Sequence, residues 1–89
     1  MTLLKLLSRP GCHLCVEMRR QVDTILADRP RSWEEVNVDS DPELARRYGD
    51  SIPALFVNGR LFAKVRLPRL ATALRLRRAA RRKPSEASV

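Results

Sequence analysis

The chain contains two cysteines, Cys12 and Cys15, and they lie three positions apart. Two thiols at this spacing can exchange electrons by forming and breaking a disulfide, or they can supply two ligands to a metal ion. An apolar run and a Pro10-Gly11 corner precede the pair, and a segment with helical periodicity follows it. We therefore expect Cys12 in the first turn of a helix and Cys15 one turn deeper, facing the core.

A cysteine at a helix N-terminus has a lowered thiol pKa, because unpaired backbone amides and the helix dipole stabilise the thiolate. Cys12 is placed for this effect, with Arg9 close by. We predict that Cys12 attacks a substrate disulfide and that Cys15 resolves the mixed disulfide, a step that proximity makes intramolecular. His13 is interpreted either as a residue that tunes the thiol or as an exposed histidine without a role.

A zinc site and a pair of inert cysteines are the alternative interpretations of the CxxC segment. A structural zinc site takes four ligands, usually from two Cys pairs or from a Cys pair and two His. The chain offers two Cys and one His, and that His lies inside the segment. A closed zinc site would need a second subunit or carboxylate ligands, so we predict no metal. Inert buried cysteines seldom follow a glycine at the start of a helix.

The elements that must position the cysteines follow from the spacing of the apolar residues. The run Leu3–Leu7 predicts a buried strand. From Cys12 onward, apolar residues recur every three or four positions, which predicts an amphipathic helix that Pro30 ends. Residues 33–38 predict a second strand. A capping aspartate, a proline and a glutamate at residues 41–43 then predict a helix that a glycine at position 49 ends.

A hairpin and a third helix complete the predicted fold. Asn58-Gly59 separates two apolar runs, which is a strong hairpin signal, and Pro53 should stand at the start of its strand. Pro68 is expected to open the last helix. The buried stripe predicted for that helix is Leu67, Leu70, Ala71 and Leu74. The order strand, helix, strand, helix, hairpin, helix predicts one α/β domain over residues 1–80, with a central four-stranded mixed sheet flanked by helices, followed by a basic flexible tail over residues 81–89.

The net charge of +8 is concentrated in the last third of the chain. Residues 1–59 carry eight Lys/Arg and nine Asp/Glu, whereas residues 60–83 carry ten Lys/Arg and no acid. A solvated cationic face is the simplest interpretation, and an acidic protein partner, nucleic acid or an anionic membrane surface are the alternatives. Among these alternatives an acidic protein partner comes first, nucleic acid second and a membrane surface third; nucleic acid is less favoured than a protein because no aromatic residue follows Phe62 for base stacking. The densest patch comprises Arg75, Arg77, Arg78, Arg81, Arg82 and Lys83.

Length and hydropathy indicate one small globular domain. No stretch of the 89 residues approaches the ~18–20 apolar residues that span a bilayer, and the N-terminus shows no signal-peptide pattern. We therefore expect a cytoplasmic monomer. In a reducing compartment, a CxxC pair is more often catalytic or metal-binding than a structural disulfide.

Three segments resemble the glutaredoxins. Residues 8–15 read Ser-Arg-Pro-Gly-Cys-His-Leu-Cys, which is similar to the glutaredoxin active-site stretch Ser-Lys-Pro-x-Cys-Pro-Tyr-Cys. Residues 37–44 resemble the second strand and following helix of that family, and residues 51–59 resemble its Thr-Val-Pro-x-x-Phe-Ile-x-Gly segment. The resemblance covers residues 2–75. More narrowly, the chain looks like the short glutaredoxin-like proteins of the thioredoxin superfamily.

This resemblance implies a thioredoxin-like fold and a thiol–disulfide oxidoreductase activity. It implies that Pro53 is cis and lies against the two cysteines, and that the backbone of Ile52 pairs with an extended substrate. Arg9 falls where the family has a lysine that helps to hold the glycine carboxylate of glutathione. The residues given substrate-binding roles on this basis are Arg9, His13, Leu14, Ser51, Ile52 and Pro53.

Two departures from the family pattern concern glutathione. His13-Leu14 replaces Pro-Tyr, which affects the redox potential and the glutathione-facing surface. The Gly-Gly element that binds the γ-glutamyl end is replaced by residues 62–66, Phe-Ala-Lys-Val-Arg. We expect no bound cofactor and take glutathione as a candidate co-substrate, with a thioredoxin-reductase-like system or a dedicated protein partner as the other sources of electrons.

Two functions are therefore weighed from the sequence. In the first, the pair Cys12 and Cys15 reduces protein disulfides or low-molecular-weight disulfides. In the second, a thioredoxin-fold binding module docks acidic partners or nucleic acid through the basic C-terminal face, with the CxxC segment as a redox sensor. The first is favoured.

Overall fold

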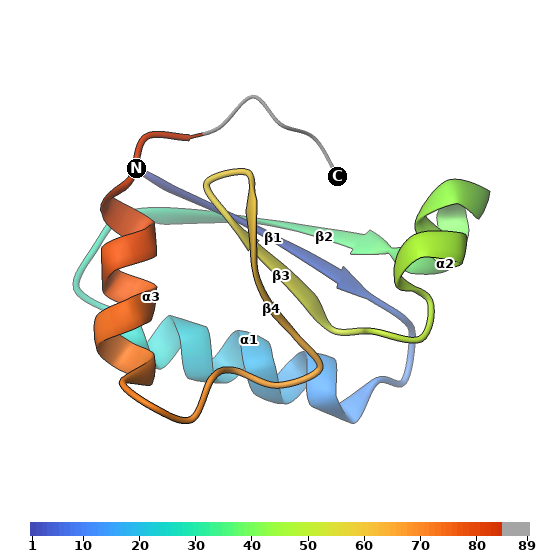
Figure 1. The fold of residues 1–89 in the computed structure, drawn as a ribbon, viewed down its shortest axis with the longest axis horizontal. Helices are drawn as coiled ribbons and strands as arrows, with labels where there is room; N and C mark the ends of the chain where they lie inside the picture. The colour runs from blue at the N-terminus through green and yellow to red at the C-terminus, as the bar shows by residue number, and fades with distance from the viewer. Residues whose placement is uncertain (85–89) are drawn as a thin grey trace.

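The computed structural model describes residues 1–84 of the chain. Its elements follow the predicted order (Figure 1). They are β1 (Thr2–Ser8), α1 (His13–Ile25), β2 (Arg31–Asn37), the 3-10 helix η1 (Val38–Ser40), α2 (Pro42–Tyr48), β3 (Ala54–Val57), β4 (Arg60–Lys64) and α3 (Thr72–Arg81). Within residues 1–84, no helix has both the length and the apolar character needed to cross a membrane.

The four strands form one mixed sheet in the order β2-β1-β3-β4, which confirms the predicted architecture (Figure 1). β1 pairs parallel with β2 and antiparallel with β3, and β3 pairs antiparallel with β4. Ser8 at the end of β1 is in register with Asn37 at the end of β2, and Leu7 is in register with Ala54 at the start of β3. One edge of the sheet therefore brings together the residues that follow β1, those that follow β2 and those that precede β3. We call it the carboxyl edge of β1.

The larger core lies between the sheet and the two helices α1 and α3. Successive strand residues point to opposite faces of a sheet, so Leu4, Leu6, Leu55 and Val57 face these helices while their neighbours do not. From the helices come Cys15, Met18, Val22, Leu26, Leu76 and Ala80, each at most 5% exposed. Cys15 is thus part of the packed core of the protein.

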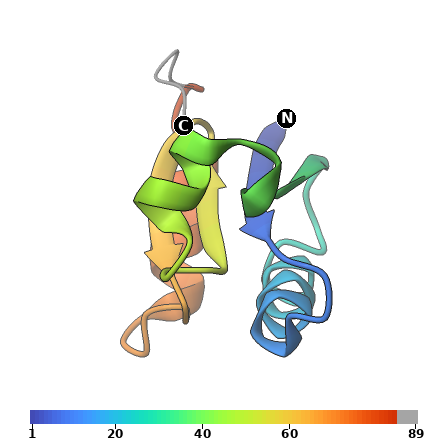
Figure 2. The same ribbon diagram turned by 90° about the vertical axis from the view of Figure 1, so that its right-hand side faces the viewer.

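The opposite face of the sheet has a smaller core. Leu7, Ala54 and Phe56 are buried there, and Leu44 and Tyr48 of α2 pack against them. The rings of Tyr48 and Phe56 meet edge to face, with centroids 5.8 Å apart. Figure 2 looks nearly down the axis of α1 and shows α2 well separated from it. The sheet therefore stands between the helix that carries the cysteines and α2.

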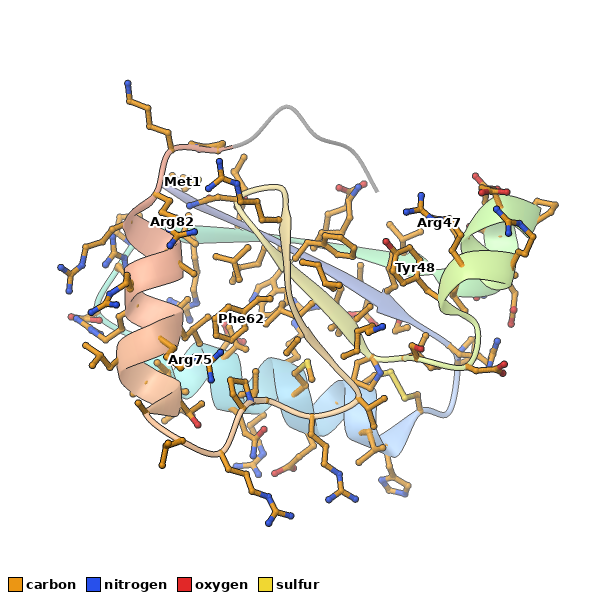
Figure 3. The ribbon with its side chains drawn as sticks, in the orientation of Figure 1. Met1, Arg47, Tyr48, Phe62, Arg75 and Arg82 are labelled. Carbon is orange, nitrogen blue, oxygen red and sulfur yellow. A yellow bond between two sulfur atoms is a disulfide. The ribbon has the colours of Figure 1, made fainter. Side chains whose placement is uncertain are left out.

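The hairpin turn at Asn58-Gly59 is confirmed, and it also fixes the end of α3. Both turn residues have positive φ, 51° for Asn58 and 85° for Gly59, as a tight hairpin requires. The Asn58 amide Nδ2 donates to the carbonyl oxygens of Ala80 (3.2 Å) and Arg82 (2.7 Å), and its Oδ1 accepts from the Leu3 N–H at 2.8 Å. Because a helix leaves its last carbonyls unpaired, this buried amide supplies the donor that the end of α3 lacks. In Figure 3, Arg82 at this end of the helix lies near Met1.

The predicted start of the third helix was wrong, and so was most of its predicted buried stripe, of which Leu67 alone packs against the core. α3 begins at Thr72 rather than at Pro68, because residues 65–71 form an irregular connection along the edge of the molecule. Leu70 is 82% exposed and Leu74 is 56% exposed, whereas Leu76 and Ala80 are buried. The face of α3 that packs against the sheet therefore carries Leu76 and Ala80 and not Leu74.

Three smaller boundaries also differ from the prediction. α1 ends at Ile25, before the turn that reaches Pro30. β2 runs over Arg31–Asn37 because its parallel pairing with β1 begins at Thr2 and Arg31, and Val38 is buried in η1 instead. In the predicted tail 81–89, residue 81 still belongs to α3. Residues 85–89 of that tail lie outside the described part of the chain, so the domain boundary stays a prediction.

Candidate redox site

A tight turn carries the chain from β1 into α1. The Cys12 N–H donates to the Arg9 carbonyl oxygen at 3.1 Å, and Gly11 has φ +78°. Proline at the second position of a turn and a left-handed glycine at the third are the marks of a type II turn. The sequence Arg9-Pro10-Gly11-Cys12 thus encodes the corner that presents Cys12 at the carboxyl edge of β1.

Cys12 is the N-cap of α1, one position before the first turn in which we predicted it. Its backbone is extended (φ −83°, ψ 104°), and its Sγ accepts a hydrogen bond from the Cys15 N–H at 3.1 Å. An N-cap side chain normally accepts such a bond through oxygen; here a sulfur takes that place. A thiolate at this position would receive an amide hydrogen bond and the positive end of the helix dipole.

Cys12 and Cys15 form a disulfide across the first turn of α1, drawn as the yellow bond in Figure 3. Their Cα atoms are 5.3 Å apart, within the usual range for a disulfide. Cys12 is half-buried, whereas Cys15 is 3% exposed and packs in the larger core. An incoming group therefore reaches the sulfur of Cys12 more readily than that of Cys15.

Arg9 is held by a carboxylate that the sequence analysis did not single out. Its Nε and Nη2 donate to Asp39 Oδ2 (2.7 Å) and Oδ1 (3.0 Å). These hydrogen bonds lower the pKa of Asp39 and raise the pKa of the Arg9 guanidinium. Arg9 follows β1 and Asp39 follows β2, and the ends of adjacent parallel strands meet at one edge. The positions of Arg9 and Asp39, each just after a predicted strand, could therefore have indicated this pair from the sequence.

Glu35 is a second acidic residue that the sequence analysis missed. Its carboxylate accepts hydrogen bonds from the Ser8 hydroxyl (2.9 Å) and from Arg19 Nη1 (2.8 Å). It thereby joins β2 to β1 and to α1 directly beside the disulfide. An isolated glutamate in an expected strand gives no sequence signal for such a role.

A hollow of about 360 Å³ brings together four of the predicted site residues. Arg9, Cys12, His13 and Cys15 line it, together with Glu35. Leu14 instead lines a separate groove on the other side of α1. His13 and Leu14 are both exposed, so the two residues between the cysteines face solvent.

The segment Ser51–Pro53 reaches the carboxyl edge of β1 from β3, but it lines neither hollow. The Ile52–Pro53 bond is cis, as the resemblance implied. Pro53 is buried and directly precedes Ala54, the partner of Leu7, and its carbonyl accepts from the Val65 N–H at 2.7 Å. Half-buried Ile52 packs against the same core cluster as Cys12 and Cys15.

The positively charged residues of the segment 60–83 do not all face solvent as one patch. Arg77 turns back to α1 and donates to both oxygens of Asp28 at 2.9 Å and to the Ile25 carbonyl. The hydrogen bonds from Arg77 lower the pKa of Asp28 to about 2. One member of the predicted dense patch is therefore a structural link between α1 and α3.

Among residues 1–84, no three His, Cys, Asp or Glu side chains gather so that they could hold a metal ion. The two cysteines are joined to each other within that part of the chain.

Fold and site together define a thioredoxin-like α/β domain with a CxxC disulfide at the start of its first helix. The chain belongs to the glutaredoxin-like domain family (DUF836), whose model matches residues 3–75. A solved structure described as "Structure of a malarial protein" has a TM-score of 0.56 and 15% identity, with 92% of this chain and 99% of that chain covered. At this identity the likeness concerns the fold alone. No curated protein matches the chain.

Proposed function

We propose that this protein is a thiol–disulfide oxidoreductase in which Cys12 is the attacking thiol and Cys15 the resolving thiol. The observation that carries the proposal is the position of Cys12 Sγ, which caps α1 and accepts the Cys15 N–H at 3.1 Å while Cys15 lies 3% exposed behind it. Membership of a glutaredoxin-like family supports a redox role.

The reaction proposed has two exchange steps. The Cys12 thiolate attacks one sulfur of a substrate disulfide, forms a mixed disulfide and releases the other substrate sulfur as a thiolate. The Cys15 thiolate then attacks the Cys12 sulfur, which forms the intramolecular disulfide and releases the second substrate thiolate. Two electrons pass from the protein dithiol to the substrate. An external dithiol, or two molecules of a monothiol such as glutathione, returns them by the reverse exchange.

Arg9 bears on the choice between these reductants. The resemblance assigned it to the carboxylate of glutathione, yet two of its donors are already bound by Asp39. A glutathione carboxylate would have to share or displace that partner. We therefore propose a dithiol reductant in the cytoplasm as the main electron source, with glutathione as a slower co-substrate.

Two cysteine variants test the proposal with hydroxyethyl disulfide, an uncharged substrate, and a dithiol reductant. We expect Cys12→Ser to reduce the rate to that of the reductant alone. Cys15→Ser, reduced and then freed of the dithiol before hydroxyethyl disulfide is added, should accumulate a mixed disulfide on Cys12, visible as an added substrate mass. If Cys12→Ser retains the rate of the unaltered protein, the proposed function is wrong.

A further inference from the structure

A second hollow, distinct from the one around Arg9, runs along the opposite side of α1. This groove of about 630 Å³ lies between α1 and the connection formed by residues 65–71. In Figure 1 that connection crosses in front of α1 on its way from β4 to α3. The groove begins at Leu14, inside the CxxC segment, and extends to Thr24 and Thr72. It therefore leads away from the disulfide along most of the helix.

The groove is apolar inside and has exposed apolar side chains at the end nearest the disulfide. Met18 is buried in its floor, and Ile25 and Leu67 are half-buried along it. Leu14 is 44% exposed and Val65 is 37% exposed. Exposed apolar side chains that line a concave surface are typical of a binding groove for a polypeptide or an apolar ligand.

Val65 holds a conformation that its side chain disfavours. Its φ is +68°, a left-handed value that is rare for a β-branched residue and strains its backbone. The bond from its N–H to the Pro53 carbonyl oxygen holds it in place. A hydrogen bond therefore joins the wall of the groove at Val65 to Pro53, which precedes β3 at the carboxyl edge of β1.

The rim of the groove carries more positive than negative charge, with three arginines and one glutamate. Arg20 is paired with Glu17 at 2.6 Å. Arg66 and Arg69 are exposed, and within residues 1–84 no carboxylate lies close enough to either to form a salt bridge. The hollow around Arg9 differs, since Arg9 pairs with Asp39 and Glu35 pairs with Arg19. An apolar groove with an unmatched cationic rim complements a segment that is apolar and acidic.

We propose that this groove binds an extended, acidic and leucine-rich segment of a protein partner, next to the cysteine that exchanges with Cys12. The inference rests on the proposed function and names its substrate class: protein disulfides with acidic and apolar neighbours. Leu14 and Val65 contact the residues nearest the partner's cysteine, and Arg66 and Arg69 pair with its carboxylates.

The first test uses two synthetic peptides that differ in charge alone. One carries glutamates and leucines around a single cysteine, and the other has lysine in place of each glutamate. Each cysteine is joined by a disulfide to a coloured aryl thiol, so attack by Cys12 on the peptide sulfur releases the aryl thiolate. At low ionic strength the reduced protein should react with the acidic peptide on the order of tenfold faster. Added salt should shrink this ratio, because screening weakens pairing at the exposed rim.

Two double variants with the same change in net charge locate the effect. Arg66→Glu with Arg69→Glu should abolish or reverse the preference for the acidic peptide. Arg60→Glu with Arg78→Glu alters two exposed cations that do not line the groove and should leave most of the preference. Equal losses in both double variants would assign the effect to net charge and overturn the proposal, as would equal rates for the two peptides.

A binding experiment separates this inference from the proposed activity. The acidic peptide with serine in place of its cysteine cannot exchange, so its binding is independent of catalysis. We expect it to shift the backbone amide NMR signals of residues 65–67 and 69 and of residues 20–25. Shifts confined to other elements, or no shifts, would overturn the proposal that the groove binds this peptide, even if the protein reduces hydroxyethyl disulfide. Failure to reduce hydroxyethyl disulfide, with the groove signals still shifted, would overturn the activity instead.

Discussion

The first helix and the third helix begin in different ways. At α1, the left-handed position before the helix is a glycine, and the side chain of Cys12 caps the first turn. At α3, the left-handed position is Ala71 (φ 54°), and no side chain caps the helix. Local chemistry therefore specifies the start of α1, whereas the start of α3 depends on contacts with the rest of the molecule.

The contacts that decide α3 lie along its length and at its far end. Leu76 is fully buried, Arg77 pairs with Asp28, and Asn58 binds the last carbonyls of the helix. The proposed function follows the same division. In it, the helix that begins with a cap presents the attacking sulfur of Cys12, and the connection before the uncapped helix forms the wall of the groove.

The largest expected effect tests which residues of α3 hold it in place. Leu76→Ala should lower the free energy of unfolding by about 2–5 kcal/mol, because it leaves a cavity in the larger core. Leu74→Ala is the matched control and should change it by less than about 0.5 kcal/mol, because Leu74 is 56% exposed. Urea unfolding of both variants measures the difference. Similar losses of stability in the two variants would contradict the observed difference in burial between Leu76 and Leu74.

The next effect concerns the cap of α1. In the reduced protein, the pKa of the Cys12 thiol should lie below the usual cysteine value of about 8.5, since an amide and the helix dipole stabilise its thiolate. The alkylation rate of Cys12 should therefore reach its plateau at a lower pH than that of a free cysteine. Peptide mapping after iodoacetamide treatment across a pH series measures it and should find Cys15 largely unmodified. An ordinary pKa for Cys12 would remove the functional difference between the two helix starts.

Exchanging the residue types at the two left-handed positions tests the comparison directly. Gly11→Ala should cost about 1 kcal/mol of stability, because alanine is strained at a φ of +78°. The added Cβ would meet nothing within 4 Å, so no steric clash adds to this cost. Ala71→Gly should gain up to about 1 kcal/mol by relieving the same strain. Urea midpoints of the two variants should move in opposite directions. A loss of stability in Ala71→Gly would mean that the strain at residue 71 is smaller than the cost of a flexible glycine.

The smallest effect is the pH dependence of the link between α1 and α3. The pKa of Asp28 falls from 3.8 to about 2 on folding, so the carboxylate stabilises the folded state above about pH 4 and loses this effect as the pH falls toward 2. Asp28→Asn should be less stable than the unaltered protein at neutral pH, with the difference shrinking over that window. Unfolding midpoints on either side of the window check this. A difference that does not vary with pH would assign the effect to packing rather than to the charge.

Much of the fold could be predicted because its signals are local. The turn at Pro10-Gly11, the capped start of α2 at Asp41 and the hairpin at Asn58-Gly59 all appear where the sequence places them. The third helix was misplaced because Pro68 is an acceptable helix start and Leu67, Leu70 and Leu74 have helical spacing. Nothing local distinguishes that stripe from the one that begins at Leu76.

The sequence by itself determined the order of the elements, the mixed sheet and the place of Cys12 at the start of the first helix. These depend on residues that are neighbours in the chain, on apolar periodicity and on backbone preferences that act within a few positions. Only the tertiary structure decided that Asp39 binds Arg9, that Asn58 closes α3 and that residues 65–71 make a groove beside Leu14. Each of these joins segments far apart in the sequence, and the pairing of the strands fixes which distant residues meet.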